Sequence, residues 1–287
     1  MGSEPGAEGV PIGAPGLVAA SGHRWPPDWL LAGLGVAYIG ALAALVFLPG
    51  GTLLDRLRVL DGGICAQLPS HSFFPGGQQL PLCARNTGIY LGFASTLLVL
   101  VVAGRTRVMR LPAVGVAVVL MLAVAMLGVD GFNSFFRDLQ LPHLYQPHNL
   151  LRLGTGLATG TAMASFLLPV ANSLIWRRED DRPAFASFGQ LAVMVPVLLI
   201  AFLAVASQAS WLLYPLALLS TAGLVAALTL INMVFVLGIS GRTGRIEGAR
   251  ALLPALTVAL ILAVVELLAL SLLKTSILQR MGGLPIS

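Results

Sequence analysis

Long apolar runs separated by short polar segments set the pattern of this chain. Several runs exceed the roughly 18 residues that a helix needs to cross a bilayer. Only helices or closed barrels satisfy their backbone hydrogen bonds in lipid, and these runs are too long and too continuously apolar for barrel strands. The pattern predicts an all-α, polytopic transmembrane helix bundle of about seven spans: Trp29–Leu48, Thr87–Ala103, Leu111–Val129, Leu153–Trp176, Phe188–Ala206, Trp211–Leu237 and Ala251–Leu273.

The composition agrees with this pattern. Hydrophobic residues make up 57% of the 287 residues and charged residues 10%. A soluble domain usually carries about a quarter charged residues. The lipid bilayer is therefore the expected partner. The net charge of +5 is scattered without a basic stripe, so no nucleic-acid partner is predicted.

Three parts are expected along the chain. Residues 1–27 are rich in Gly, Ala and Pro without apolar periodicity, which predicts a disordered tail. Residues 28–176 hold the first four spans, and residues 177–287 hold the other three. We expect a four-helix membrane unit with two long outer loops, followed by a three-helix membrane unit.

Arginines in the short connections predict the orientation. They follow the second, fourth and sixth spans, and short loops of this kind stay on the cytoplasmic side. The amino terminus is then inside and the carboxyl terminus outside, with both long loops on the outer face. The arginines are Arg105, Arg107, Arg110, Arg177, Arg178, Arg182, Arg242, Arg245 and Arg250.

The two long outer loops share a sequence pattern. In each, an Asp-Gly pair at Asp61 or Asp130 precedes an arginine and then Thr-Gly-x-x-x-Gly at the start of a span. Small residues at this spacing let the second and fourth spans approach closely. The likeness is either chance, because such pairs are common, or a parallel hairpin repeat in the first four spans. The small residues are Gly88, Gly92, Gly156 and Gly160.

Charged and amide side chains occupy similar places in the two loops, where helices enter the membrane. They are Asp61, Arg85, Asp130, Asn149 and Arg152. One interpretation is local salt bridges or helix-end contacts. The other is a polar, ligand-binding pocket at the outer mouth, where helix amino ends would favour an anionic group.

Glu266 lies inside the last apolar span and joins these candidate ligand-binding residues. A carboxylate at bilayer depth should face the bundle interior or be protonated, because its burial in lipid is costly. Glu266 would be a proton or cation relay, an anchor for a cationic ligand, or a neutral acid bonded to a nearby hydroxyl. Arg85 and Arg152 are its expected partners.

The segment ICAQLPSHSFFPGGQQLPLCARNTGIYLG, residues 64–92, resembles the signature of a prokaryotic membrane-protein family catalogued as domain of unknown function 2085. A second block, from Asp130 to Gly160, extends the resemblance to about residues 61–160. This chain differs from the family's pattern at Ala66, His71 and Asn86, where the family has His, Arg and Cys. The resemblance implies a protein of a prokaryotic cytoplasmic membrane and no particular activity. The matching signature positions are Cys65, Gln67, Ser72, Phe73, Gln79, Pro81, Cys83, Arg85, Thr87, Gly88, Tyr90 and Gly92.

Three alternatives remain for the two cysteines, Cys65 and Cys83. A disulfide between them would staple the first outer loop and stabilise the protein by about 3 kcal/mol. They could instead bind a metal with His71 and either His143 or His148, although no tight ligand pair exists. The third alternative is two free thiols. The disulfide is the expectation adopted here, and no metal site is assigned.

The sequence leaves the activity and any cofactor unknown. No phosphate loop or dinucleotide-binding motif is visible. We expect a small molecule to be bound or transported at the polar pocket of the outer loops. The alternatives are an accessory subunit that binds another membrane protein, or a membrane enzyme with a redox or metal site in these loops.

Overall fold

The structure is a computed structural model that describes residues 51–177, 180–247 and 249–280. The expected tail and the first expected span, Trp29–Leu48, lie outside these residues. The long elements are helices: α2 (Leu53–Asp61), α3 (Ala84–Val102), α4 (Val114–Asp138), α5 (Asn149–Ile175), α6 (Phe188–Ala192), α7 (Met194–Ala206), α8 (Leu213–Ile239) and α9 (Ala249–Arg280). Three short 3-10 turns accompany them: η1 (Pro69–His71), η2 (Pro75–Gly77) and η3 (Ser210–Leu212).

Six helical segments among the described residues are long and apolar enough to cross a membrane. They correspond to the second to seventh expected spans, and α6 and α7 together form one of them. This confirms an all-α, polytopic helix bundle. The division into units at residues 28–176 and 177–287 stays a prediction. The six segments are Ala84–Val102, Val114–Asp138, Asn149–Ile175, Phe188–Ala206, Ser210–Ile239 and Ala251–Arg280.

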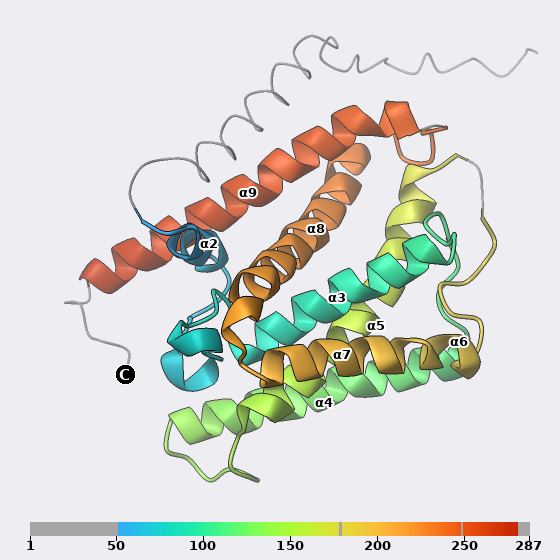
Figure 1. Ribbon diagram of the computed structural model, residues 1–287. Helices are drawn as coiled ribbons and strands as arrows, with labels where there is room; N and C mark the ends of the chain where they lie inside the picture. The colour runs from blue at the N-terminus through green and yellow to red at the C-terminus, as the bar shows by residue number, and fades with distance from the viewer. Residues whose placement is uncertain (1–50, 178–179, 248, 281–287) are drawn as a thin grey trace, which may run out of the picture.

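The described helices lie side by side, with α3 and α5 in the middle (Figure 1). Helix α8 packs against both of these and α9 packs outside α8, while α4 and α7 lie on the other side. We call the end of the bundle formed by residues 62–83, 139–148 and 207–212 the loop end. The opposite end, formed by residues 103–113, 180–187 and 240–247, is the basic end.

Helices α3 and α5 cross through their glycines. A Cβ atom added at Gly92 would collide with the Leu157 carbonyl, and one added at Gly160 would collide with the Ile89 carbonyl. Gly88 and Gly156 meet in the same way one turn nearer the loop end. Because the paired residues rise in number together, the two helices run in the same direction. Only residues without a side chain allow so close a backbone approach.

Helix α4 continues further than the sequence predicted. The segment after Asp130 was expected to be loop, but the helix runs on to Asp138, so the loop that follows is shorter than predicted. Asp130, Asn133 and Ser134 are buried, while Phe132 and Phe135 are exposed. Polar residues at positions i, i+3 and i+4 make one inward face of a helix. The Asp-Gly pair therefore lies within a helix, whereas Asp61 ends α2, and the two loops are not alike at this point.

Helix α2 is a short amphipathic helix that the span pattern did not predict. A capping box between Thr52 and Asp55 starts it, because each side chain accepts the other residue's backbone N–H. Leu54, Leu57 and Leu60 are buried against the bundle. Helix α2 contacts α8 and α9, and it delivers the chain into the first loop at the loop end.

Amide side chains hold that first loop in place. Gln67 adopts a positive φ of 58° and donates to the carbonyl oxygens of Arg58 and Pro81, both at 2.8 Å. Gln79 donates to the Gln67 carbonyl and to the Ser72 hydroxyl. These amide hydrogen bonds fix the loop over the loop end together with its apolar side chains Phe73 and Leu80, which are buried in the core of the bundle.

Candidate functional site

A group of polar side chains lies at the loop end, between α3, α4 and α5. Arg85 at the start of α3 donates to Asp130 Oδ2 at 2.5 Å and to the Ser134 hydroxyl at 3.1 Å. Tyr145, in the loop after α4, donates its hydroxyl to the other Asp130 oxygen at 3.0 Å. The predicted residues Arg85 and Asp130 therefore meet, one from α3 and the other from α4.

Arg152 and Asn149 complete this group from the first turn of α5. Arg152 Nη1 donates to Asn149 Oδ1 at 2.8 Å, and Arg152 Nε lies 3.4 Å from the Ser134 hydroxyl. Asn149 also donates to the carbonyl oxygens of Ser70 and Ser72, each at 3.2 Å. We call the whole group the arginine network: Arg85, Asp130, Ser134, Tyr145, Asn149 and Arg152.

The two arginines of the network have unused hydrogen-bond donors. Arg152 is 2% exposed and Asp130 is 1% exposed. Arg85 Nε and Arg152 Nη2 are buried, and no hydrogen-bond partner for them exists among the described residues. Buried polar groups are usually paired, and an unpaired one commonly marks a bound water, ion or ligand. The network can therefore accept one more acceptor group.

His71 lies at the edge of the network. Its Nε2 atom is 3.4 Å from an oxygen of Asp138. Burial lowers the pKa of His71, and the positive charge of Arg152 lowers it further, against the opposing effect of Asp138. The imidazole is therefore neutral at pH 7 and leaves the charge of this region to the two arginines and the carboxylates.

A groove opens next to the network. It has a volume of about 400 Å³ and is lined partly by polar residues of three loop-end segments. Asn149 belongs to this lining and to the network at once, so its amide separates the groove from Arg152. The polar lining residues are Ser70, Ser72, His148, Asn149 and Gln208.

Asp61 does not join the network. It is fully buried, and its Oδ2 atom accepts a hydrogen bond from Thr221 of α8 at 2.7 Å. Its Oδ1 atom has no partner among the described residues. Burial raises the pKa of Asp61 to about 7. The expectation that Asp61 and Asp130 share one pocket is therefore wrong, because α2 turns Asp61 toward α8.

Glu266 also lies apart from the arginines. It accepts a hydrogen bond from Asn232 Nδ2 at 2.9 Å across the contact between α8 and α9. The expected partnership with Arg85 or Arg152 is wrong, since both arginines bond to α4 and α5 residues instead. An amide donor is the kind of partner expected for a polar group inside a helix bundle.

The predicted disulfide is absent, and Cys65 and Cys83 are free cysteines. The two cysteines are 3.4 Å apart, whereas the sulfur atoms of a disulfide are roughly 2.05 Å apart. The Cys83 backbone N–H donates to the Cys65 sulfur at 3.2 Å. Hydrogen bonding from the Cys83 thiol lowers the pKa of Cys65 to about 6, while that same bond and burial raise the pKa of Cys83. The two thiols thus form a hydrogen-bonded pair that ionises first at Cys65.

His143 and His148, the histidines of the alternative metal site, make other contacts. His148 caps α5 by accepting the Leu150 N–H at 3.2 Å, and His143 lies near the Leu141 carbonyl. The parts of the chain that the structure describes contain no group of three or more His, Cys, Asp or Glu side chains that could hold a metal ion.

Sequence reasoning missed Ser134, Tyr145 and Thr221, which each bond to a predicted charged residue. The contact of Ser134 could have been predicted, because Ser134 stands four residues after Asp130 and therefore on the same face of a helix. The contacts of Tyr145 and Thr221 could not, because they depend on how distant segments fold together.

Residues 65–166 match a family described as "Predicted membrane protein (DUF2085)". This confirms the family resemblance, and the matched segment contains the whole arginine network. An uncharacterized protein of Methanocaldococcus jannaschii is 28% identical over 115 residues, which cover 40% of this chain and 68% of that protein. No solved structure matches the chain.

Proposed function

We propose that this membrane protein binds a small anionic molecule, a carboxylate or a phosphate, at the arginine network. The observation that carries the proposal is the buried Arg152, whose Nη2 atom lacks a partner among the described residues. A guanidinium presents a fixed fork of donors that suits carboxylate and phosphate oxygens. An anionic oxygen at this place would accept a hydrogen bond from Arg152 Nη2.

The charge balance of the network supports an anionic ligand. The network holds two arginines and one buried carboxylate, Asp130, which pairs with Arg85, while Arg152 contacts the neighbouring Ser134. Asp138 is 42% exposed and pairs with His71, which is neutral. A buried positive charge without a full counter-charge is unfavourable, so the site gains most from a ligand with the opposite charge.

The groove beside Asn149 supplies the entry for the ligand. Asn149 accepts from Arg152 and donates to the loop carbonyls that flank the groove. Rotation of this one side chain would open the guanidinium to a molecule in the groove. By the distribution of arginines in the short connections, we also propose that the loop end faces the outside of a cytoplasmic membrane.

The proposal is tested by thermal unfolding of the detergent-purified protein with inorganic phosphate and with succinate as probes. One of them should raise the melting temperature of the wild-type protein, because a ligand that binds only the folded state stabilises it. Arg152→Gln should abolish this rise while remaining folded without ligand. Uptake of the same probe into proteoliposomes would then separate a transporter from a binding protein.

The control is Arg137→Gln, which removes an exposed arginine of α4 outside the network. It should keep the ligand-induced rise in melting temperature. The proposal fails if Arg152→Gln keeps the wild-type response, or if both substitutions lower the response equally.

A further inference from the structure

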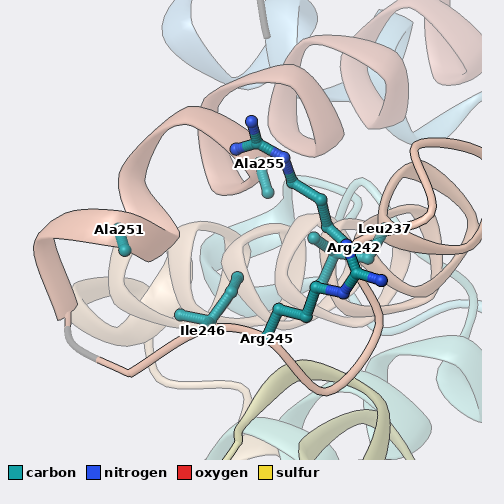
Figure 2. A pocket seen from close by; sticks show the side chains of 6 residues that line it. All are labelled: Leu237, Arg242, Arg245, Ile246, Ala251 and Ala255. Carbon is teal, nitrogen blue, oxygen red and sulfur yellow. The ribbon is translucent and has the colours of Figure 1, made fainter. Parts of the chain in front are cut away.

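A second polar cavity lies at the basic end, where α8 gives way to α9. It has a volume of about 200 Å³. Figure 2 shows that two arginine side chains enter it from the connection between these helices, while two alanines come from α9. Its described lining consists of Leu237, Arg242, Arg245, Ile246, Ala251 and Ala255.

The lining combines two cations with an apolar wall. Arg242 is half-buried and its side chain extends toward Ala255 (Figure 2), while Arg245 is exposed. Leu237, Ile246 and Ala255 are all buried. One side of the cavity therefore suits an anionic oxygen group, and the other suits hydrocarbon.

The cavity lies where the spans end. Helix α8 ends at Ile239 and α9 begins at Ala249, so Arg242 and Arg245 stand at the depth of lipid headgroups. The connections 103–113, 176–187 and 240–248 together carry eight arginines and four carboxylates in the sequence. Trp176 lies in the same region, under the guanidinium of Arg107 at 4.2 Å. Tryptophan and arginine are enriched at a membrane surface.

We propose that Arg242 and Arg245 bind the phosphate of an anionic phospholipid, with the lipid's glycerol and upper acyl chains against the exposed Ala251. Basic pockets between spanning helices suit such headgroups. The volume is smaller than the roughly 300 Å³ at which drug-sized ligand pockets begin, and it fits a headgroup phosphate better than a nucleotide. The site lies at the opposite end of the bundle from the arginine network and does not depend on the function proposed there.

Native mass spectrometry of the full chain in detergent tests the proposal. The probes are dioleoyl phosphatidylglycerol and dioleoyl phosphatidylcholine. We expect the wild-type protein to prefer the anionic lipid by about tenfold in affinity, because each arginine near the headgroup adds attraction. The double substitution Arg242→Gln/Arg245→Gln should remove this preference.

The matched control is Arg110→Gln/Arg182→Gln, which removes the same charge from the same end. These arginines pair with Asp181 and Asp180 outside the cavity, so the preference should remain. Equal loss in both double variants would overturn the proposal, because a diffuse positive surface would then explain the binding. Absence of any preference in the wild-type protein would overturn it as well.

Two further measurements keep the test decisive. Ala251→Leu fills the cavity from an exposed position of α9 without changing the charge, and it should also reduce the preference for the anionic lipid. An unchanged preference in this variant would contradict the proposal even if the arginine variant fails to fold. Soluble glycerol 1-phosphate should compete weakly; displacement of the lipid at equal concentration would show that the site takes free phosphate esters instead.

Discussion

The two ends of the bundle use the same kinds of charged residue in opposite ways. At the loop end, the ion pair of Arg85 and Asp130 has a carboxylate that is 1% exposed, and it lies among helices. At the basic end, the pair of Arg110 and Asp181 has side chains that are 64% and 72% exposed. The loops themselves differ too, since residues 62–83 contain no Asp, Glu, Lys or Arg.

Burial decides how much an ion pair contributes to the stability of the fold. An exposed ion pair contributes about 0–1 kcal/mol, whereas breaking a buried pair costs about 3–5 kcal/mol. At the loop end, the buried ion pair is therefore expected to contribute to the stability of the fold. The basic end is a charged surface suited to the membrane.

The largest effect is expected where α3 and α5 cross, since this crossing positions Arg85 and Arg152 of the arginine network. Gly160→Leu should destabilise the protein by about 5 kcal/mol or more, enough to prevent folding, because the added side chain meets the Ile89 backbone. Yield of monodisperse protein and thermal unfolding measure this. Gly128→Leu in α4, where a Cβ meets nothing within 4 Å, is the control and should fold.

A smaller effect is expected from removing the buried carboxylate. Asp130→Ala should lower the free energy of unfolding by about 3 kcal/mol, because Arg85 and Tyr145 lose their shared partner. Asp181→Ala at the basic end should change it by less than about 1 kcal/mol. Chemical denaturation measures the free energy of unfolding of both variants. Equal losses in the two variants would contradict the proposed difference between the two ends.

The smallest effect is a pH dependence at Asp61. Burial raises its pKa from 3.8 to about 7, so the folded state binds a proton more tightly than the unfolded state. Stability should therefore fall as the pH rises from about 4 to 7 and level off above 7. Asp61→Asn removes this loss and should stabilise the protein at pH 8 relative to the wild type.

Asp55→Asn, in the same helix, is the control for this pH dependence. Hydrogen bonds from Thr52 lower the pKa of Asp55, so its titration ends below the measured range. The melting temperature should be measured from pH 5 to pH 8. Its dependence on pH should be the same in Asp55→Asn as in the wild type, and weaker in Asp61→Asn. Identical slopes in all three proteins would show that Asp61 ionises freely.

Features that depend on local spacing could be predicted from the sequence. The spans follow from apolar length, and the small residues Gly92 and Gly160 marked the faces on which α3 and α5 meet. Arg85 and Asp130 were candidates because both border membrane helices.

Features that depend on how distant segments fold together could not be predicted. The length of α4 was underestimated because Asp130-Gly131 resembles a turn, although its polar side chains form one helix face. Asp61 was placed in the wrong group since nothing in the sequence shows that Thr221 lies beside it. The thiols were expected to form a disulfide because the loop was predicted to lie outside the membrane, where thiols oxidise, but they are free.

The crossing of α3 and α5 has a consequence for how the protein enters the bilayer. These two segments have the lowest mean hydropathy of the six that could span it, and they are separated along the chain by α4. Because the contact needs both helices, we expect α3 to lack its partner until α5 has been synthesised. Insertion of the two segments should therefore be coupled through the same glycine contact that holds the folded bundle together.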